Sequence, residues 1–154
     1  MFRKIIFLLV ISLIPIMSSA EISVFEFNPT DVNRGGMTKE QSEGLLIIAL
    51  KHEKYDLSVS GAFVDGDLQD KQGNAPHPGY YDFSVGYDNP TAGAIEYWGV
   101  FSVSPRTGDI WEINECKRIS FPILQKAQKE IIKKTGVTFA DEVAQRRGLG
   151  CTDE

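Results

Sequence analysis

Residues that could carry out catalysis are sparse in this chain of 154 residues. It contains only two histidines, His52 in a helical pattern and His77 between two prolines. Their separation does not give the H-x-x-x-H spacing that places two imidazoles beside one metal ion. No serine stands in the turn motif of an activated nucleophile. We therefore expect no catalytic residue, no metal site and no cofactor, and we interpret both histidines as incidental.

Carboxylates offer two further candidates for chemistry. The aspartates of segment 65–70 resemble a calcium loop, but Gln69 and Pro76 stand where oxygen ligands are required. We interpret that segment as a solvated acidic loop. Glu112 and Glu115 have the residue types of an acid/base pair for hydrolysis, so a small carboxylate-dependent hydrolase stays open as an alternative.

The two cysteines, Cys116 and Cys151, have the simplest chemistry to predict. They lack the C-x-x-C spacing of a redox pair. An even number of cysteines in an exported chain predicts a structural disulfide. Closing a loop of about 35 residues would stabilise the fold by roughly 3–4 kcal/mol in the chain-entropy model.

The N-terminal segment predicts export. Arg3 and Lys4 precede the apolar run 5–16, and Ser18-Ser19-Ala20 supplies small residues before Glu21. The run is too short to cross a bilayer, so we expect cleavage after Ala20 and no stable membrane insertion afterwards. The prediction is a signal peptide over 1–20, one domain over 21–154, and a periplasmic or secreted location.

The charge narrows the class of partner. The formal net charge is −5, and loss of Arg3 and Lys4 with the signal peptide makes it −7. An acidic exported protein is a poor match for nucleic acid or for an anionic membrane surface. A basic protein partner, such as a hydrolase or toxin, suits this charge better.

Local patterns predict the elements that position these residues. Segment 21–27 alternates like a short strand, and segment 56–64 is a second candidate strand. Thr38 and Gln41 form a capping box for a helix that runs through His52. Segments 80–87, 95–104 and 109–115 predict an antiparallel meander with a tight turn around Arg106 and Thr107.

The last third of the chain predicts two helices. Ser120 and Pro122 open the first, and Gly136 ends it. Thr138 and Asp141 make a capping box for the second. The predicted fold class is α+β: an N-terminal helix packed on a three- to four-stranded antiparallel meander, followed by two helices and pinned by one disulfide.

The predicted turn also sets which side chains share a face of the sheet. It pairs Val103 with Ile110 and Ser102 with Trp111, and it places Trp98 on the same face as Trp111. Both faces are then apolar, which leaves two interpretations: helices cover both, or one face is a binding surface. Arg106 at the turn, flanked by Trp98 and Trp111, is the candidate anchor for a protein partner.

Part of the chain resembles a known kind of protein. The residues that carry the resemblance are 79–83, the turn motif Val103-Ser104-Pro105-Arg106-Thr107-Gly108-Asp109-Ile110, Cys116 and the pair Leu124-Gln125. They look like small exported bacterial proteins with a helix-plus-meander, PepSY-like domain, which include periplasmic immunity proteins against toxins from neighbouring cells. The resemblance implies this fold and an inhibitory role, and it assigns no functional residue.

The function we predict is a non-catalytic binding protein, an inhibitor or immunity protein against a cell-wall-degrading toxin. A rigid, disulfide-locked scaffold with an exposed anchor can block an active site without chemistry of its own. The alternative is a carrier for a small apolar ligand, with a pocket lined by Tyr81, Phe83, Tyr97 and Phe101.

Overall fold

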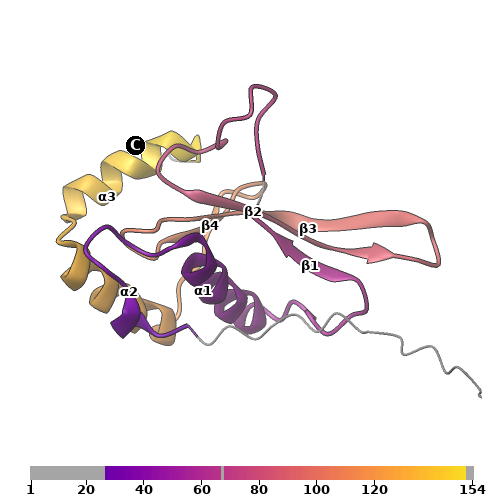
Figure 1. Cartoon of the computed structure of the whole chain (residues 1–154), viewed down its shortest axis with the longest axis horizontal. Coiled ribbons are helices and arrows are strands. Elements are labelled where there is room, and N and C mark those ends of the chain that lie inside the picture. The colour runs from indigo at the N-terminus through magenta and orange to yellow at the C-terminus, as the bar shows by residue number, and fades with distance from the viewer. Residues whose placement is uncertain (1–26, 67, 152–154) are drawn as a thin grey trace, which may run out of the picture.

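The computed structural model describes residues 27–66 and 68–151. In that part of the chain, three α-helices accompany one five-stranded antiparallel sheet (Figure 1). The elements are η1 (Pro29–Asp31), α1 (Lys39–His52), β1 (Ala62–Asp65), β2 (Tyr81–Asn89), β3 (Ala94–Val103), β4 (Ile110–Glu112), β5 (Lys117–Arg118), α2 (Pro122–Thr135), α3 (Phe139–Arg146) and η2 (Arg147–Leu149). The strands pair in chain order, so the α+β class and the meander are confirmed, with more strands than predicted. The predicted signal peptide and most of the predicted strand 21–27 lie outside the described residues.

Helix α1 begins where its capping box predicts. The Thr38 side chain accepts a hydrogen bond from the backbone of Gln41, and the Gln41 side chain accepts one from the backbone of Thr38. Leu46 and Leu50 are fully buried and belong to the same core as Phe83 and Phe101 of the sheet. Helix α2 contributes to this core as well, so α1 and α2 pack on one side of the sheet, which we call the α1 side.

The C-terminal helices differ from the prediction in one cap. The N-cap of α2 is Phe121 and not Ser120, with Pro122 at the first helical position. The Ser120 hydroxyl instead accepts a hydrogen bond from the Gln125 side chain. Gly136, at a φ of 69°, ends α2 in the left-handed conformation that glycine adopts without strain. The capping box of Thr138 then starts α3 as predicted.

The predicted register between β3 and β4 is confirmed. Val103 pairs with Ile110, and Ser102 pairs with Trp111. The predicted face of Trp98 is wrong, because β3 contains a β-bulge opposite Val85 and Gly86. An extra residue in one strand shifts the alternation of side chains beyond it. Trp98 therefore packs on the α1 side, while Trp111 lies on the opposite side.

The opposite side of the sheet carries a second, smaller core. Tyr80 and Trp111 pack there with Leu149 of η2, and Cys151 adjoins them. We call this the α3 side, since η2 continues directly from α3. Within residues 27–66 and 68–151, none of the helices combines the length and apolar character that crossing a bilayer requires.

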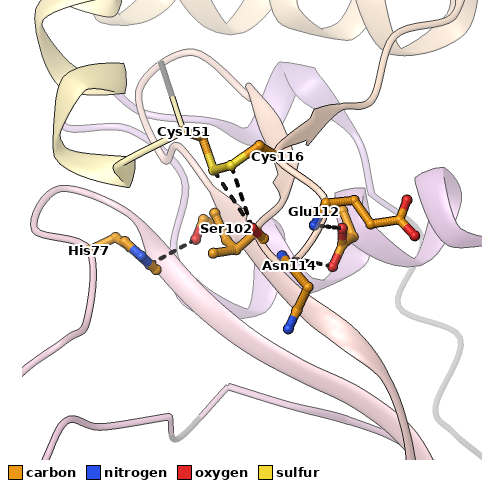
Figure 2. The surroundings of a disulfide bond; sticks show 8 residues. His77, Ser102, Glu112, Asn114, Cys116 and Cys151 are labelled. Atoms are coloured by element: carbon orange, nitrogen blue, oxygen red, sulfur yellow. Dashed lines mark hydrogen bonds between the residues drawn. A yellow bond between two sulfur atoms is a disulfide. The ribbon is translucent and has the colours of Figure 1, made fainter. Parts of the chain in front are cut away.

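The predicted disulfide is confirmed. Cys116 and Cys151 are bonded, and their Cα atoms lie 5.0 Å apart (Figure 2). Cys116 lies in the turn between β4 and β5, and Cys151 follows η2. The bond therefore holds the end of η2, and with it α3, against the edge of the sheet.

Candidate functional site

The turn between β3 and β4 presents Arg106 on a heavily supported backbone. The Ser104 amide donates to the carbonyl oxygen of Asp109 at 2.8 Å, and the Gly108 amide donates to that of Ser104 at 2.8 Å. The Thr135 hydroxyl of α2 donates to the carbonyl oxygen of Arg106 at 2.7 Å. The Arg106 side chain itself is exposed. Hydrogen bonds within the turn and from α2 therefore fix its backbone, while the Arg106 side chain faces solvent.

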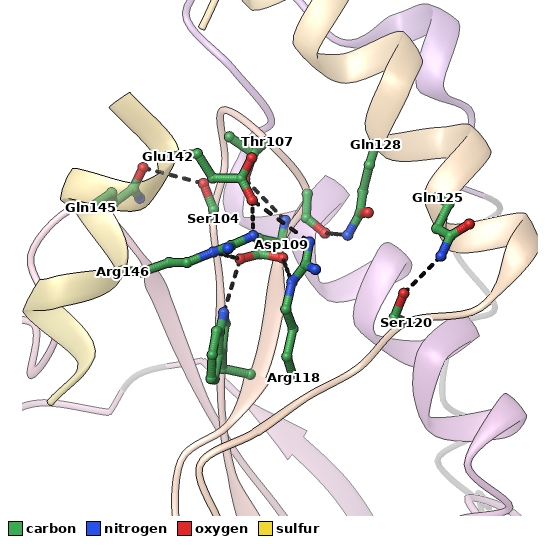
Figure 3. Close-up of polar contacts among 12 residues, drawn as sticks. Ser104, Thr107, Asp109, Arg118, Ser120, Gln125, Gln128, Glu142, Gln145 and Arg146 are labelled. Atoms are coloured by element: carbon green, nitrogen blue, oxygen red, sulfur yellow. Dashed lines mark hydrogen bonds and ion pairs between the residues drawn. The ribbon is translucent and has the colours of Figure 1, made fainter. Parts of the chain in front are cut away.

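A buried carboxylate anchors this turn to three other elements (Figure 3). Asp109, which is 1% exposed, accepts hydrogen bonds from Trp111 Nε1 at 2.9 Å, from Arg118 Nε at 2.6 Å and from Arg146 Nε at 2.8 Å. Arg146 also pairs with Glu142 one helical turn earlier. Two guanidinium groups around one carboxylate satisfy a charge that would otherwise be costly to bury.

The three predicted anchor residues occupy different environments. Arg106 is exposed, Trp98 is half-buried, and Trp111 is 7% exposed. Trp98 contacts the rings of Tyr55 and Tyr87, each with a centroid distance of 5.8 Å. Between Trp98 and Val103 lie five strand steps, roughly 17 Å, so Trp98 is remote from the turn. The buried Trp111 supports the turn through its hydrogen bond to Asp109. The three side chains therefore do not form one surface patch.

One further surface is exposed and apolar. Ile95 and Tyr97 near the far end of β3 are 53% and 64% exposed. Register places Tyr97 beside Gly86 and Phe63, on the face opposite Tyr87 and Trp98. The second core does not extend this far along the sheet. Helices thus cover the α1 side near Phe83 and Phe101, and the α3 side is covered near Trp111 but open at Tyr97.

A polar cluster that sequence reasoning missed lies on the same side. His77 Nδ1 is 3.1 Å from Ser102 Oγ (Figure 2). It is also 2.7 Å from Asp82 Oδ1, and the Ser102 hydroxyl donates to the same carboxylate. In a catalytic triad the carboxylate and the serine lie at opposite ring nitrogens. Here both lie at Nδ1, and Ser102 is fully buried. The cluster fixes the loop before β2, so His77 has a structural role.

The candidate carboxylates also serve local structure. Glu112 is buried and accepts hydrogen bonds from the amides of Asn114 at 3.0 Å and Glu115 at 2.7 Å, which stabilises the turn after β4. The Asp70 side chain accepts from the amides of Gln72 and Asn74, both at 2.8 Å. The backbone amide of Asn74 is the largest cause of its lowered pKa. In the described residues, no three His, Cys, Asp or Glu side chains form a group that could hold a metal ion.

The predicted lining of a ligand pocket is divided between the two sides of the sheet. Phe83 and Phe101 are fully buried in the main core on the α1 side. Tyr97 is exposed on the other side of the sheet. These side chains do not surround a common cavity, and this arrangement does not support the carrier alternative.

Comparisons with known proteins define the class. Residues 36–143 match the family model of the type VI secretion system (T6SS) immunity protein Tgi2PP. The chain therefore belongs to this family, which confirms the immunity-protein part of the predicted resemblance; the PepSY-like part stays a prediction. A solved chain in the structure of a type VI secretion system effector–immunity complex from Pseudomonas protegens is 54% identical, with a TM-score of 0.77. The similarity covers 82% of this chain and 99% of that chain. None of the curated proteins matches.

Proposed function

We propose that this protein is an immunity protein that binds a type VI effector enzyme and blocks it without catalysis. The observation that carries the proposal is membership of the immunity family over residues 36–143, together with 54% identity to a chain from an effector–immunity complex. The rigid scaffold supports it, because a preorganised surface loses little conformational entropy on binding. The polar residues that could have carried chemistry are instead engaged in turns and ion pairs.

The effector we propose is a cell-wall-degrading hydrolase, and the place of inhibition is the periplasm. The apolar segment 5–16 with its small residues at 18–20 supports export. The disulfide between Cys116 and Cys151 supports an oxidising compartment. A cell-wall hydrolase delivered by a neighbouring cell acts in that compartment, so the inhibitor has to reach it too.

The contact we propose first is the turn at Arg106. An exposed guanidinium can pair with a carboxylate through two parallel hydrogen bonds, and cell-wall hydrolases of the glycosidase type use carboxylates for catalysis. Trp111 supports the turn through Asp109, and the exposed part of Trp98 is proposed as a peripheral contact. A fixed backbone under an exposed cation is the arrangement of an interface anchor.

A protection experiment tests this function. Bacteria are given the cognate type VI effector, directed to their periplasm, together with either the full chain or a variant without residues 2–20. The full chain should prevent lysis, and the truncated variant should not. Lysis despite an abundant, folded full chain would refute the function. Equal protection by the truncated variant would refute the periplasmic location, and sequencing of the mature N-terminus should find Glu21.

A further inference from the structure

The β2–β3 hairpin extends beyond the helices as an arm (Figure 1). We define the arm as residues 86–97, together with Phe63 of the neighbouring strand. The Phe63 and Tyr97 rings meet edge to face across Gly86, with centroids 6.1 Å apart. Ile95 and Tyr97 are largely exposed on this face. Exposed aromatic and aliphatic side chains at one place on a small protein are typical of an interaction surface.

The arm is built to hold a fixed shape. A Cβ atom at Gly86 would collide with the carbonyl oxygen of Glu96 and approach Phe63 Cζ to 3.1 Å, so only glycine lets the two strands and the ring lie this close. At the tip, the Asn89 side chain accepts hydrogen bonds from the amides of Thr91 and Ala92, both at 3.1 Å. A surface ordered before binding loses less entropy when it docks.

The charged side chains of the arm are all acidic. Asp88 and Glu96 are exposed, and the sequence between Lys71 and Arg106 contains no lysine or arginine. The Tyr87 hydroxyl donates to Glu96 at 2.9 Å, which fixes that carboxylate on the face of the arm opposite Tyr97. Two acidic arms would repel each other, so the arm does not suit contact with a second copy of this chain. It suits a basic surface.

We propose that the arm is a second docking surface, which inserts Tyr97 and Ile95 into a positively charged groove of the effector. This inference rests on the proposed function and extends it by naming the chemistry of the partner. Lysine and arginine side chains of the groove pair with Asp88 and Glu96, and arginine can also stack on an aromatic face. Charge complementarity of this kind speeds association and selects the partner.

Matched variants test the arm. The arm variants are Tyr97→Ala, Ile95→Ser and the double reversal Asp88→Lys with Glu96→Lys. Phe139→Ala on α3 is the control for an exposed aromatic, since Phe139 is 74% exposed, and Glu130→Lys on α2 is the control for charge. Each variant is checked by thermal unfolding, and its affinity for the cognate type VI effector is measured by calorimetry and by association kinetics at low and high salt.

We expect Tyr97→Ala to weaken the complex about 30-fold, as removal of an anchor residue does. The double reversal should slow association about 10-fold at low salt, with a smaller effect at high salt. Both controls should stay within about two-fold of the wild type, the range of a neutral contact. Arm variants that fold normally and bind like the controls would overturn the arm while leaving the proposed function in place. A wild-type chain that neither binds nor inhibits the effector would overturn both.

Discussion

Asp109 and Arg146 join the tight turn of the sheet to helix α3, with Arg146 Nε 2.8 Å from Asp109 Oδ2. The two residues are 37 positions apart in the chain. The same carboxylate binds Arg118 of β5, and the disulfide ties Cys151 to the neighbouring turn. The backbone that presents Arg106 is therefore fixed by contacts on the buried side of the turn.

Replacement of Asp109 should destabilise the protein more than replacement of a surface carboxylate. In Asp109→Ala, Arg146 at 15% exposure and Arg118 at 38% exposure would both lose this carboxylate, and Glu142 alone would be left to pair with the two guanidinium groups. We expect a loss of about 2–4 kcal/mol, below the value for a fully buried pair because Arg118 is partly solvated. Urea unfolding measures it, with Glu130→Ala as the control. A loss below about 0.5 kcal/mol, the level of an ordinary surface change, would contradict the role of Asp109.

Replacement of Tyr80 by phenylalanine should not destabilise the protein. The Tyr80 hydroxyl is buried and has no hydrogen-bond partner among the described residues, and burial raises the pKa of this side chain. Removing an unsatisfied buried group while keeping its ring recovers the cost of its desolvation. We expect Tyr80→Phe to be neutral or up to about 1 kcal/mol more stable. A clear decrease in the unfolding midpoint would show that the hydroxyl is satisfied, for instance by a water molecule.

The disulfide should contribute a large share of the stability. Replacement of both Cys116 and Cys151 by serine should cost about 2–5 kcal/mol, because the unfolded chain regains the freedom of the closed loop. Circular dichroism melts of the oxidised protein and of the double variant measure the difference. Thiol titration of unreduced, periplasm-derived protein provides the check, and two free thiols would contradict the bond.

Arg106→Ala should separate binding from folding. An exposed turn side chain contributes little to stability, so the melting temperature should stay near that of the wild type. The effector complex should weaken by about 2 kcal/mol if Arg106 is an anchor. Arg147→Ala is a matched control, since Arg147 of η2 is another exposed arginine. Equal affinities of both variants and the wild type would remove the turn from the interface.

The sequence patterns that predicted structure correctly are local ones. The capping boxes at Thr38 and Thr138 depend on residues three positions apart, and both helices begin there. The turn at Arg106 and Thr107 set the β3–β4 register, because side-chain facing in strands has a period of two.

The errors concern contacts between distant segments. The bulge that moves Trp98 to the α1 side depends on how β3 pairs with Val85 and Gly86 in another strand. His77 contacts Ser102 from 25 positions away, and no local pattern announces such a contact. The sequence indicates only that Asp82 and Ser102, from the alternation along their strands, point to the same side as Trp111. The candidate site was predicted in part: the exposure of Arg106 followed from the turn, whereas the burial of Trp111 required α3 and η2.

We propose that this protein inhibits a cell-wall hydrolase by binding it. The most direct measurement is a titration of the purified chain into the cognate type VI effector, with release of soluble fragments from purified cell wall as the readout. We predict that fragment release falls in proportion to added chain and stops near an equimolar ratio, and that the chain alone releases nothing. Undiminished effector activity in the presence of excess folded chain, or degradation of the cell wall by the chain itself, would contradict the account.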